Sequence, residues 1–153
     1  MMHLLPMTEI EFQHYLSTAI KEYAKNKIDA GTWTNENAFK NANASFKELL
    51  PAGIKTANTF FYSITFQADT VGYIWFASYR DNPLMAFIYD FKIYDNFQNK
   101  GFGSKALQLT TQEAKLKGFS SIALHVFGSN KRAIHVYEKN GFTTTDITMQ
   151  KKL

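Results

Sequence analysis

The feature that most constrains the fold is a series of three segments in the middle of the chain, each rich in β-branched and aromatic residues. These segments are Thr59–Gln67, Val71–Tyr79 and Met85–Ile93. Short polar turns join them, first Ala68-Asp69-Thr70 and then Arg80-Asp81-Asn82-Pro83. Segments of this length and composition, separated by so few residues, predict three strands of an antiparallel meander.

Two helices are predicted before this meander, after a short apolar start at His3–Leu5 that we expect to form an edge strand. Thr8-Glu9-Ile10-Glu11 has the pattern of a capping box, in which the threonine hydroxyl and the second carboxylate satisfy backbone donors reciprocally. Apolar residues recur at helical spacing from there to about Lys27. A second helix is predicted over Asn35–Leu50, because a proline and a glycine follow it.

The last third of the chain alternates between helices and strands. The predicted elements are a helix over Gly103–Lys117, a strand over Ser121–Val126, a helix over Asn130–Lys139 and a final strand over Thr143–Lys151. Together with the meander they predict a mixed α/β fold. No linker interrupts the pattern, so we expect residues 1–153 to form a single domain.

Composition excludes several classes of protein. The chain has no cysteine, which excludes disulfides and thiolate nucleophiles and is compatible with a cytoplasmic location. Its net charge of +4 is spread without a dense basic stripe, so no nucleic-acid partner is expected. No apolar stretch is long enough for a signal peptide or a membrane span. His3 and His14 have no partner at metal-ligand spacing, so no metal site is predicted.

The loop from Gln98 to Ser104, with the sequence Gln-Asn-Lys-Gly-Phe-Gly-Ser, lies between a predicted strand and a predicted helix. Gly101 and Gly103 allow the backbone to approach a ligand closely. Free amides at the start of the following helix, together with the helix dipole, favour a phosphate group. Lys100 adds positive charge, so the loop is a candidate phosphate-binding site.

Three phosphate-binding patterns compete for this loop. The Walker pattern G-x-x-x-x-G-K-[ST] is excluded, because the Gly, Ser and Lys at 103–105 have the wrong order. The dinucleotide pattern G-x-G-x-x-[GA] is met by Gly101, Gly103 and Ala106, but the next predicted strand lacks the acidic residue that would hold a ribose. The third pattern, [QR]-x-x-G-x-[GA], is met in full by Gln98 and the two glycines.

The third pattern resembles the pyrophosphate loop of the GNAT superfamily of N-acetyltransferases, and three other segments agree with that family in order and spacing. Asp90–Ile93 is similar to the family's splayed fourth strand, and Leu124–Val126 is similar to its fifth strand. Asn130–Phe142 is similar to the signature N-x-x-A-x-x-x-Y-x-x-x-G-F. The resemblance implies a GNAT-like fold, with a mostly antiparallel sheet splayed between strands four and five and helices on both faces.

The resemblance also implies a cosubstrate and a reaction. Acetyl-coenzyme A would lie in the splay, and its acetyl group would pass directly to a primary amine of a small molecule or peptide. Backbone donors near Phe91, Lys92 and Ile93 are expected to hold the thioester and pantetheine. The residues expected at the rest of coenzyme A are Gln98, Asn99, Lys100, Gly101, Phe102, Gly103, Ser104 and Asn130, the last of which also serves as a helix N-cap.

Three side chains are candidates for proton transfer under this resemblance. Tyr137 is expected to protonate the departing sulfur, and the alternative is a tyrosine of the core. His125 is a candidate base, and the alternative is a half-buried strand histidine hydrogen-bonded to the backbone. Asp90 is a candidate for binding or deprotonating the amine, and the alternative is an exposed strand carboxylate. In a regular strand Asp90 and Lys92 would lie on the opposite face from Tyr89. The family has a bulge at this position, so the alternation does not predict which face each side chain takes.

Other functions stay open from the sequence alone. The same scaffold could bind acetyl-coenzyme A as a sensor without turnover, and the loose glycine pattern leaves a nicotinamide-dependent oxidoreductase. No acyl-enzyme is expected, because there is no cysteine and no serine in a nucleophile motif such as G-x-S-x-G. The expected assembly is a homodimer, and no membrane partner is expected.

Overall fold

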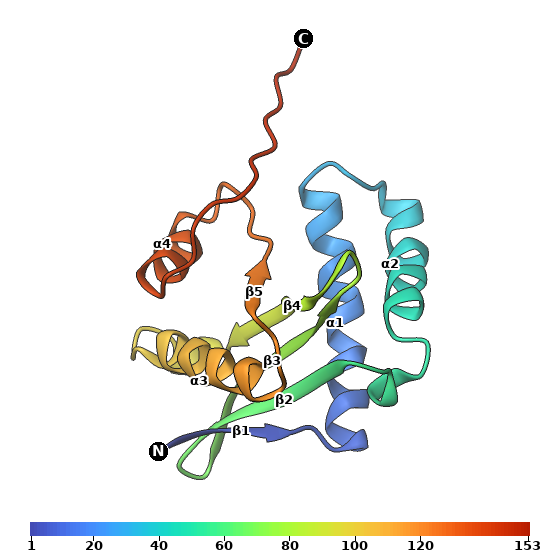
Figure 1. Ribbon diagram of the computed structural model, residues 1–153. Helices are drawn as coiled ribbons and strands as arrows, with labels where there is room; N and C mark the ends of the chain where they lie inside the picture. Colours follow the sequence, from blue (N-terminus) through green and yellow to red (C-terminus); the bar gives the residue numbers. More distant parts are fainter.

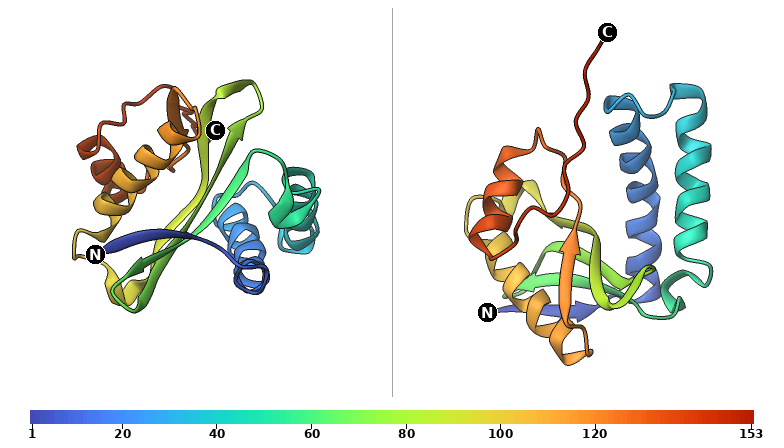
Figure 2. Two further views of the ribbon diagram at one scale, coloured as in Figure 1. Left: turned by 60° about the horizontal axis from the view of Figure 1, so that its bottom comes forward. Right: turned by 45° about the horizontal axis from the view of Figure 1, so that its top comes forward.

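A five-stranded sheet forms the middle layer of the molecule, with two helices against each face (Figures 1 and 2). The computed structural model describes residues 1–153. The strands lie in the order in which they occur in the chain: β1 (Met2–Pro6), β2 (Thr59–Phe66), β3 (Asp69–Tyr79), β4 (Asn82–Ile93) and β5 (Ser121–Leu124). Neighbouring strands are antiparallel except for β4 and β5, which are parallel. The predicted meander is therefore confirmed.

The helices are α1 (Glu9–Asp29), α2 (Asn35–Leu49), α3 (Phe102–Leu116) and α4 (Lys131–Lys139), with short 3₁₀ turns at Gly53–Lys55 and Asp95–Phe97. The predicted capping box starts α1: the Thr8 amide donates to Glu11 Oε1 at 2.9 Å, and the Glu11 amide donates to Thr8 Oγ1 at 3.2 Å. No helix of the structure combines the length and apolarity needed to cross a membrane.

Side-chain alternation along the central strands divides the core between the two faces. On one face Ile64, Ile74 and Phe76 pack with Leu107 of α3 in the larger cluster of buried residues. On the other face Phe61 and Trp75 pack with Phe12 and Tyr15 of α1 and with Phe46 of α2. Because period-two alternation places successive side chains on opposite faces, the aromatic strands supply both cores at once.

A β-bulge in β4 interrupts this alternation. Trp75 of β3 pairs with Asp90 and Phe76 pairs with Ile88, which leaves Tyr89 as an extra residue in β4. Tyr89 and Asp90 consequently face the same layer: the Tyr89 ring stacks on Trp75 at 4.9 Å, and Asp90 accepts a hydrogen bond from Tyr15 of α1. A bulge has this effect because two residues oppose one on the partner strand.

The bulge also marks the place where the sheet opens. β5 pairs with β4 only from Met85 to Ile88, so the pairing ends one residue before the bulge. β5 is therefore two residues shorter than predicted, because His125 and Val126 have no strand beside them once β4 turns away. The splay between the fourth and fifth strands, implied by the family resemblance, is confirmed.

The predicted final strand over Thr143–Lys151 is wrong for the single chain. The last backbone hydrogen bond is donated by Phe142 to the carbonyl of Tyr137, and residues 143–153 form an exposed extension that leaves the body of the molecule (Figure 1). A strand needs a neighbour for its backbone groups, and no strand of the same chain lies beside this segment.

The close approach of β3 to the end of β4 yields a stability prediction. A methyl group on Gly72 would lie 2.1 Å from the Lys92 carbonyl oxygen. Gly72→Ala should therefore lower the free energy of unfolding by about 1–3 kcal/mol, the usual cost of overpacking. For a chain of this length Tm should fall by about 2–4 °C for each kcal/mol lost. Thermal unfolding measures the change. Gly128→Ala is the control, because nothing lies within 4 Å of a methyl group there, and equal Tm values for the two variants would contradict this account.

Candidate active site

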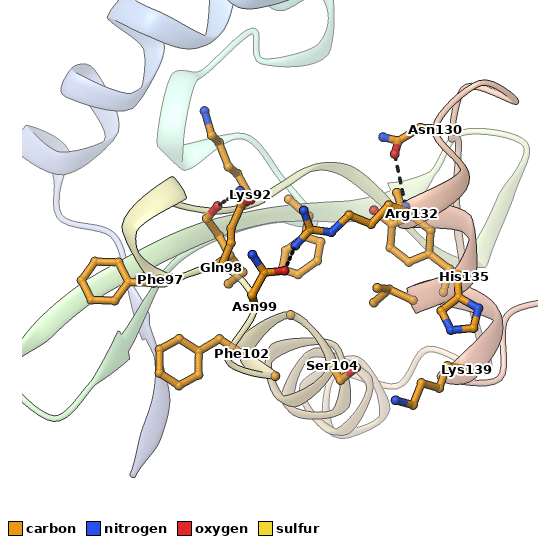
Figure 3. A pocket seen from close by; sticks show the side chains of 17 residues that line it. Lys92, Phe97, Gln98, Asn99, Phe102, Ser104, Asn130, Arg132, His135 and Lys139 are labelled. Atoms are coloured by element: carbon orange, nitrogen blue, oxygen red, sulfur yellow. Dashed lines mark hydrogen bonds between the residues drawn. The ribbon is translucent and has the colours of Figure 1, made fainter.

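A pocket of about 620 Å³ lies between the end of β4, the loop that follows it and α4 (Figure 3). Ten of the eleven residues expected to hold a cosubstrate line it: Phe91, Lys92, Ile93, Gln98, Asn99, Gly101, Phe102, Gly103, Ser104 and Asn130. Lys100, the eleventh, is exposed and does not line the pocket. The structure thus gathers residues from three elements around one cavity.

The loop is shaped by its backbone and by one half-buried side chain, that of Gln98. Asn99 and Gly101 have φ values of 63° and 78°, so the chain turns sharply through the left-handed region before α3 begins. The Gln98 side chain holds the loop to the end of β4, because its Nε2 donates to the Ile93 carbonyl at 2.9 Å and to Asp95 Oδ1 at 3.2 Å. The glutamine of the motif therefore has a positioning role in this structure.

The first turn of α3 presents free backbone donors to the pocket. Its first intrahelical bond is donated by Lys105 to the Gly101 carbonyl, so the amides of Phe102, Gly103 and Ser104 have no backbone partner. A Cβ added at Gly103 would meet nothing within 4 Å, which shows that the space over this turn is open. Unpaired amides and the positive end of the helix dipole fit an anionic group such as a pyrophosphate.

Basic side chains of α4 stand on the other side of the pocket. Arg132, His135 and Lys139 lie three and four residues apart on one face of α4, and all three line the cavity (Figure 3). The guanidinium of Arg132 reaches across and donates to Asn99 Oδ1. Arg132 and Lys139 were not among the expected site residues, although their spacing on one helix face is visible in the sequence.

Lys92 contributes to the pocket differently from the basic residues of α4. Its ammonium group points toward α1 and lies 3.5 Å from Glu22 Oε1 (Figure 3). The backbone of Lys92, rather than its charge, is therefore the part that faces the opening between β4 and β5.

Tyr137 lies inside the pocket, one helical turn after Ala133, which also lines it. Its hydroxyl makes no hydrogen bond within the protein, and its ring packs edge-on against Phe142 at 5.8 Å between centroids. Burial raises the pKa of Tyr137, and the negative charge of Asp90 raises it further. The hydroxyl therefore keeps its proton at neutral pH and is available as a donor.

Asp90 lies outside the pocket, on the α1 side of the bulge. The Tyr15 hydroxyl donates to Asp90 Oδ2 at 2.6 Å, so the alternative of an exposed strand carboxylate is wrong. Burial raises the pKa of Asp90 and outweighs the opposing effect of the hydrogen bond from Tyr15, while the nearby charge of Glu22 adds to the increase.

His125 is exposed and follows the last residue of β5. Its ring packs edge-on against Phe127 at 5.2 Å, and it makes no hydrogen bond within the protein. The alternative of a half-buried histidine bonded to the backbone is therefore wrong. The structure brings Tyr137 together with the glycine loop, and it leaves His125 and Asp90 outside this pocket.

A second cavity, of about 150 Å³, lies on the α1/α2 face beside the bulge. Trp75 and Tyr89 line it with Glu48 and Arg80, whose side chains form an exposed ion pair at 3.5 Å. Trp75 Nε1 is buried without a hydrogen-bond partner. A buried donor without a partner is unfavourable, so this face retains an unused donor next to the splay.

Residues 32–142 match the sequence profile of the Acetyltransferase (GNAT) family. The chain belongs to this family. It is 39% identical to the "Uncharacterized N-acetyltransferase YycN" of Bacillus subtilis, over 98% of this chain and 97% of the relative, and 36% identical to YdgE of the same organism, over 96% and 95%. The family and the enzyme class, an acetyltransferase, are therefore as predicted.

Solved structures agree with the fold of this GNAT acetyltransferase. The crystal structure of the putative acetyltransferase YycN superposes with a TM-score of 0.93 at 38% identity, covering 100% of this chain and 99% of that one. A putative streptothricin acetyltransferase from Bacillus anthracis, solved in complex with acetyl coenzyme A, shares the fold with a TM-score of 0.52 at 24% identity, over 58% and 50% of the two chains.

The environment of Asp90 yields a pH prediction. Because its pKa is raised in the folded chain, the folded state holds this proton more tightly than the unfolded state, and ionisation of Asp90 costs stability as the pH rises above the ordinary value of 3.8. Asp90→Asn keeps an acceptor for Tyr15 and removes the charge. It should raise Tm at pH 7 by about 2–4 °C for each kcal/mol gained in the free energy of unfolding. The gain should shrink toward pH 4. Thermal unfolding at both pH values tests this, with the exposed Asp81→Asn as a control that should show no change.

Proposed function

We propose that this acetyltransferase transfers the acetyl group of acetyl-coenzyme A directly to a primary amine of a small molecule or a peptide. The observation that carries the proposal is one pocket that combines unpaired amides of α3, a basic face of α4 and the protonated hydroxyl of Tyr137. The acetyl coenzyme A complex of a protein with the same fold supports the choice of cosubstrate.

The amides of Phe102, Gly103 and Ser104 are assigned to the pyrophosphate, where fixed backbone dipoles bind charge without reorganisation. Arg132 and Lys139 stand opposite and neutralise the remaining phosphate charge. To bind a phosphate with its full fork, Arg132 has to release Asn99, which is exposed to the same pocket.

The pantetheine arm is assigned to β4 beyond the bulge. From Tyr89 onward the edge of β4 that faces β5 has no neighbouring strand. The backbone of Phe91 and Lys92 is thus free to pair with the amides of an extended ligand, as an added strand would. This geometry would hold the thioester at the point where β4 and β5 part, close to Tyr137.

Transfer requires the amine nitrogen to bond to the acetyl carbon while the carbon–sulfur bond breaks. The Tyr137 hydroxyl is assigned to donate a proton to the departing sulfur. The amine must also lose a proton, because a lysine-like amine with a pKa near ~10.4 is almost fully protonated at neutral pH. Asp90 and His125, which lie within two residues of the end of β4–β5 pairing, are the candidate bases, directly or through water.

Ligand-induced stabilisation tests the cosubstrate. Acetyl-coenzyme A at a hundredfold its Kd should stabilise the protein by about 2.7 kcal/mol, or roughly 5–10 °C in Tm, whereas NADH and ATP should give much smaller shifts. Gly103→Val should fold normally but lose this response, because its side chain would enter the open space over α3. A shift with NADH alone would favour the oxidoreductase, and the absence of any shift with acetyl-coenzyme A would contradict the proposal.

Replacement of Tyr137 tests the reaction. Tyr137→Phe removes the proposed acid and keeps the ring against Phe142, so kcat should fall by about 100-fold or more while KM for acetyl-coenzyme A changes little. Free thiol release with a panel of amines measures the rate. Tyr23→Phe is the control, because Tyr23 packs between Trp33 and Phe46 away from the pocket. An unchanged kcat in Tyr137→Phe would remove the proposed acid, and binding without turnover by the unaltered protein would indicate a sensor.

A further inference from the structure

The second cavity, on the α1/α2 face, has no part in the proposed site for acetyl-coenzyme A, and no residue lines both cavities. Its volume of about 150 Å³ suits one small polar group rather than a second cofactor. It lies on the same face of the sheet as Asp90, a candidate base. A cavity in this place can bind part of the amine that accepts the acetyl group.

The cavity contains hydrogen-bond donors that have no partner. Trp75 is 3% exposed, and its Nε1 is buried without an acceptor. The Tyr89 hydroxyl makes no hydrogen bond within the protein either. Burial raises the pKa of Tyr89, Tyr79 adds to the increase, and the charge of Arg80 opposes it. The Tyr89 hydroxyl is therefore a protonated donor that lies near the Arg80 guanidinium.

The other hydroxyl groups of the lining are already bonded. Those of Thr56, Thr59 and Ser78 each donate to a backbone carbonyl, at 2.7, 3.1 and 3.1 Å. The unused hydrogen-bonding capacity of the cavity therefore consists of donors. A carboxylate is the group that fits this set, because its two oxygens only accept hydrogen bonds and together accept several.

Arg80 supplies the positive charge that a carboxylate requires. A guanidinium has five N–H donors in a planar fork, and Arg80 uses them in one contact, from Nη2 to Glu48 Oε1 at 3.5 Å. The two side chains are 70% and 69% exposed, and a pair this long and this exposed is weak. A carboxylate that enters the cavity can replace Glu48 and bind the fork through two parallel hydrogen bonds.

The cavity is close to the point where β4 and β5 part. Trp75 pairs with Asp90 across β3 and β4, and both side chains face the α1/α2 layer. Paired residues of antiparallel strands have Cα atoms only about 4.5–5.5 Å apart. A molecule of amino-acid size that places a carboxylate at Arg80 and Trp75 can therefore present an amine beside Asp90.

We propose that the acceptor is an amine that also carries a carboxylate, as a free amino acid does, and that the second cavity binds this carboxylate through Arg80, Trp75 and Tyr89. The inference rests on the proposed acetyl transfer and adds the chemical class of its acceptor. An amine without a carboxylate leaves these donors unpaired, and a site built from polar groups discriminates against such an analogue.

Turnover of matched substrates is the first test. The panel consists of the common amino acids as free acids, each with its C-terminal amide as the control, and release of free thiol from acetyl-coenzyme A gives the rate. KM for a reactive acid should be lower than KM for its amide by about 10-fold or more. Equal KM values, or turnover only of amines without a carboxylate, would overturn the inference and leave acetyl transfer in place.

Two variants of one ion pair should have opposite effects. Arg80→Gln should raise KM for the acid by about 10-fold or more, with kcat nearly unchanged, and abolish its advantage over the amide. Glu48→Gln removes the competing carboxylate and should lower KM. A purely structural role of the pair would shift both variants in the same direction.

Lys47→Gln is the matched control, because Lys47 is exposed, lines neither cavity and loses the same charge as Arg80 does. KM for the acid should stay within about 2-fold of the unaltered protein, since solvent and salt screen an exposed charge. A preference for the acid over the amide that survives Arg80→Gln would overturn this cavity as the carboxylate site.

Fluorescence separates binding in the cavity from the reaction. The chain has two tryptophans, so Trp33→Phe leaves Trp75 as the single emitter, and Trp33 packs against Tyr23 outside both cavities. With coenzyme A present, an amino acid of the panel should change the emission of Trp75 saturably, whereas its amide should not. The absence of this change with every acid would overturn the inference. A saturable change without any turnover would instead support the carboxylate site and contradict the proposed reaction.

Discussion

The extra residue of β4 at Tyr89 determines how the rest of the site is arranged. It rotates the end of β4, so that Tyr89 and Asp90 both face α1 and α2, while Phe91 and Ile93 return to the α3 side. β5 stops pairing one residue before this point. The cavity therefore exists because two parallel strands share a continuous sheet up to Ile88 and then part. A regular β4 would have continued the ladder and closed the space.

The opening in the sheet has a fixed strand end on one side and free backbone donors on the other. On the β4 side, Gln98 binds the Ile93 carbonyl and Gly72 approaches the Lys92 carbonyl closely, which fixes the strand end. On the α3 side, the first amides of the helix stay free. The rigid edge and the free amides face one cavity, as a preorganised site for an extended anionic ligand requires.

The parts of this structure that the sequence predicted are those fixed over a few residues. The capping box at Thr8, the turn through Gly101 and the N-cap at Asn130 are set by neighbours three or four positions away. The helix pattern that placed Tyr137 beside Ala133 is equally local. For this reason the family resemblance that these motifs carry implied the fold, and ten of the eleven residues that it named line the pocket.

The features that the sequence did not predict depend on residues far apart in the chain. The bond between Tyr15 and Asp90 joins positions 75 residues apart, and the packing of α1 against β4 that allows it leaves Asp90 half-buried, with a pKa raised by that burial. The bond between Arg132 and Asn99 spans 33 residues. Neither pair has a local sequence signal, because each depends on how the helices are set against the sheet.

The C-terminal extension, residues 143–153, shows the opposite case, because its sequence predicts a strand that the single chain does not form. Period-two patterning describes the surface that a segment can bury, and it does not say which chain provides the other surface. In this protein Phe142 anchors the segment and directs it away from its own sheet. The same residue also holds α4, because the Phe142 amide donates to the Tyr137 carbonyl at 3.0 Å and the two rings pack at 5.8 Å between centroids. The residue that directs the C-terminal segment therefore also positions the proposed acid Tyr137 against the core.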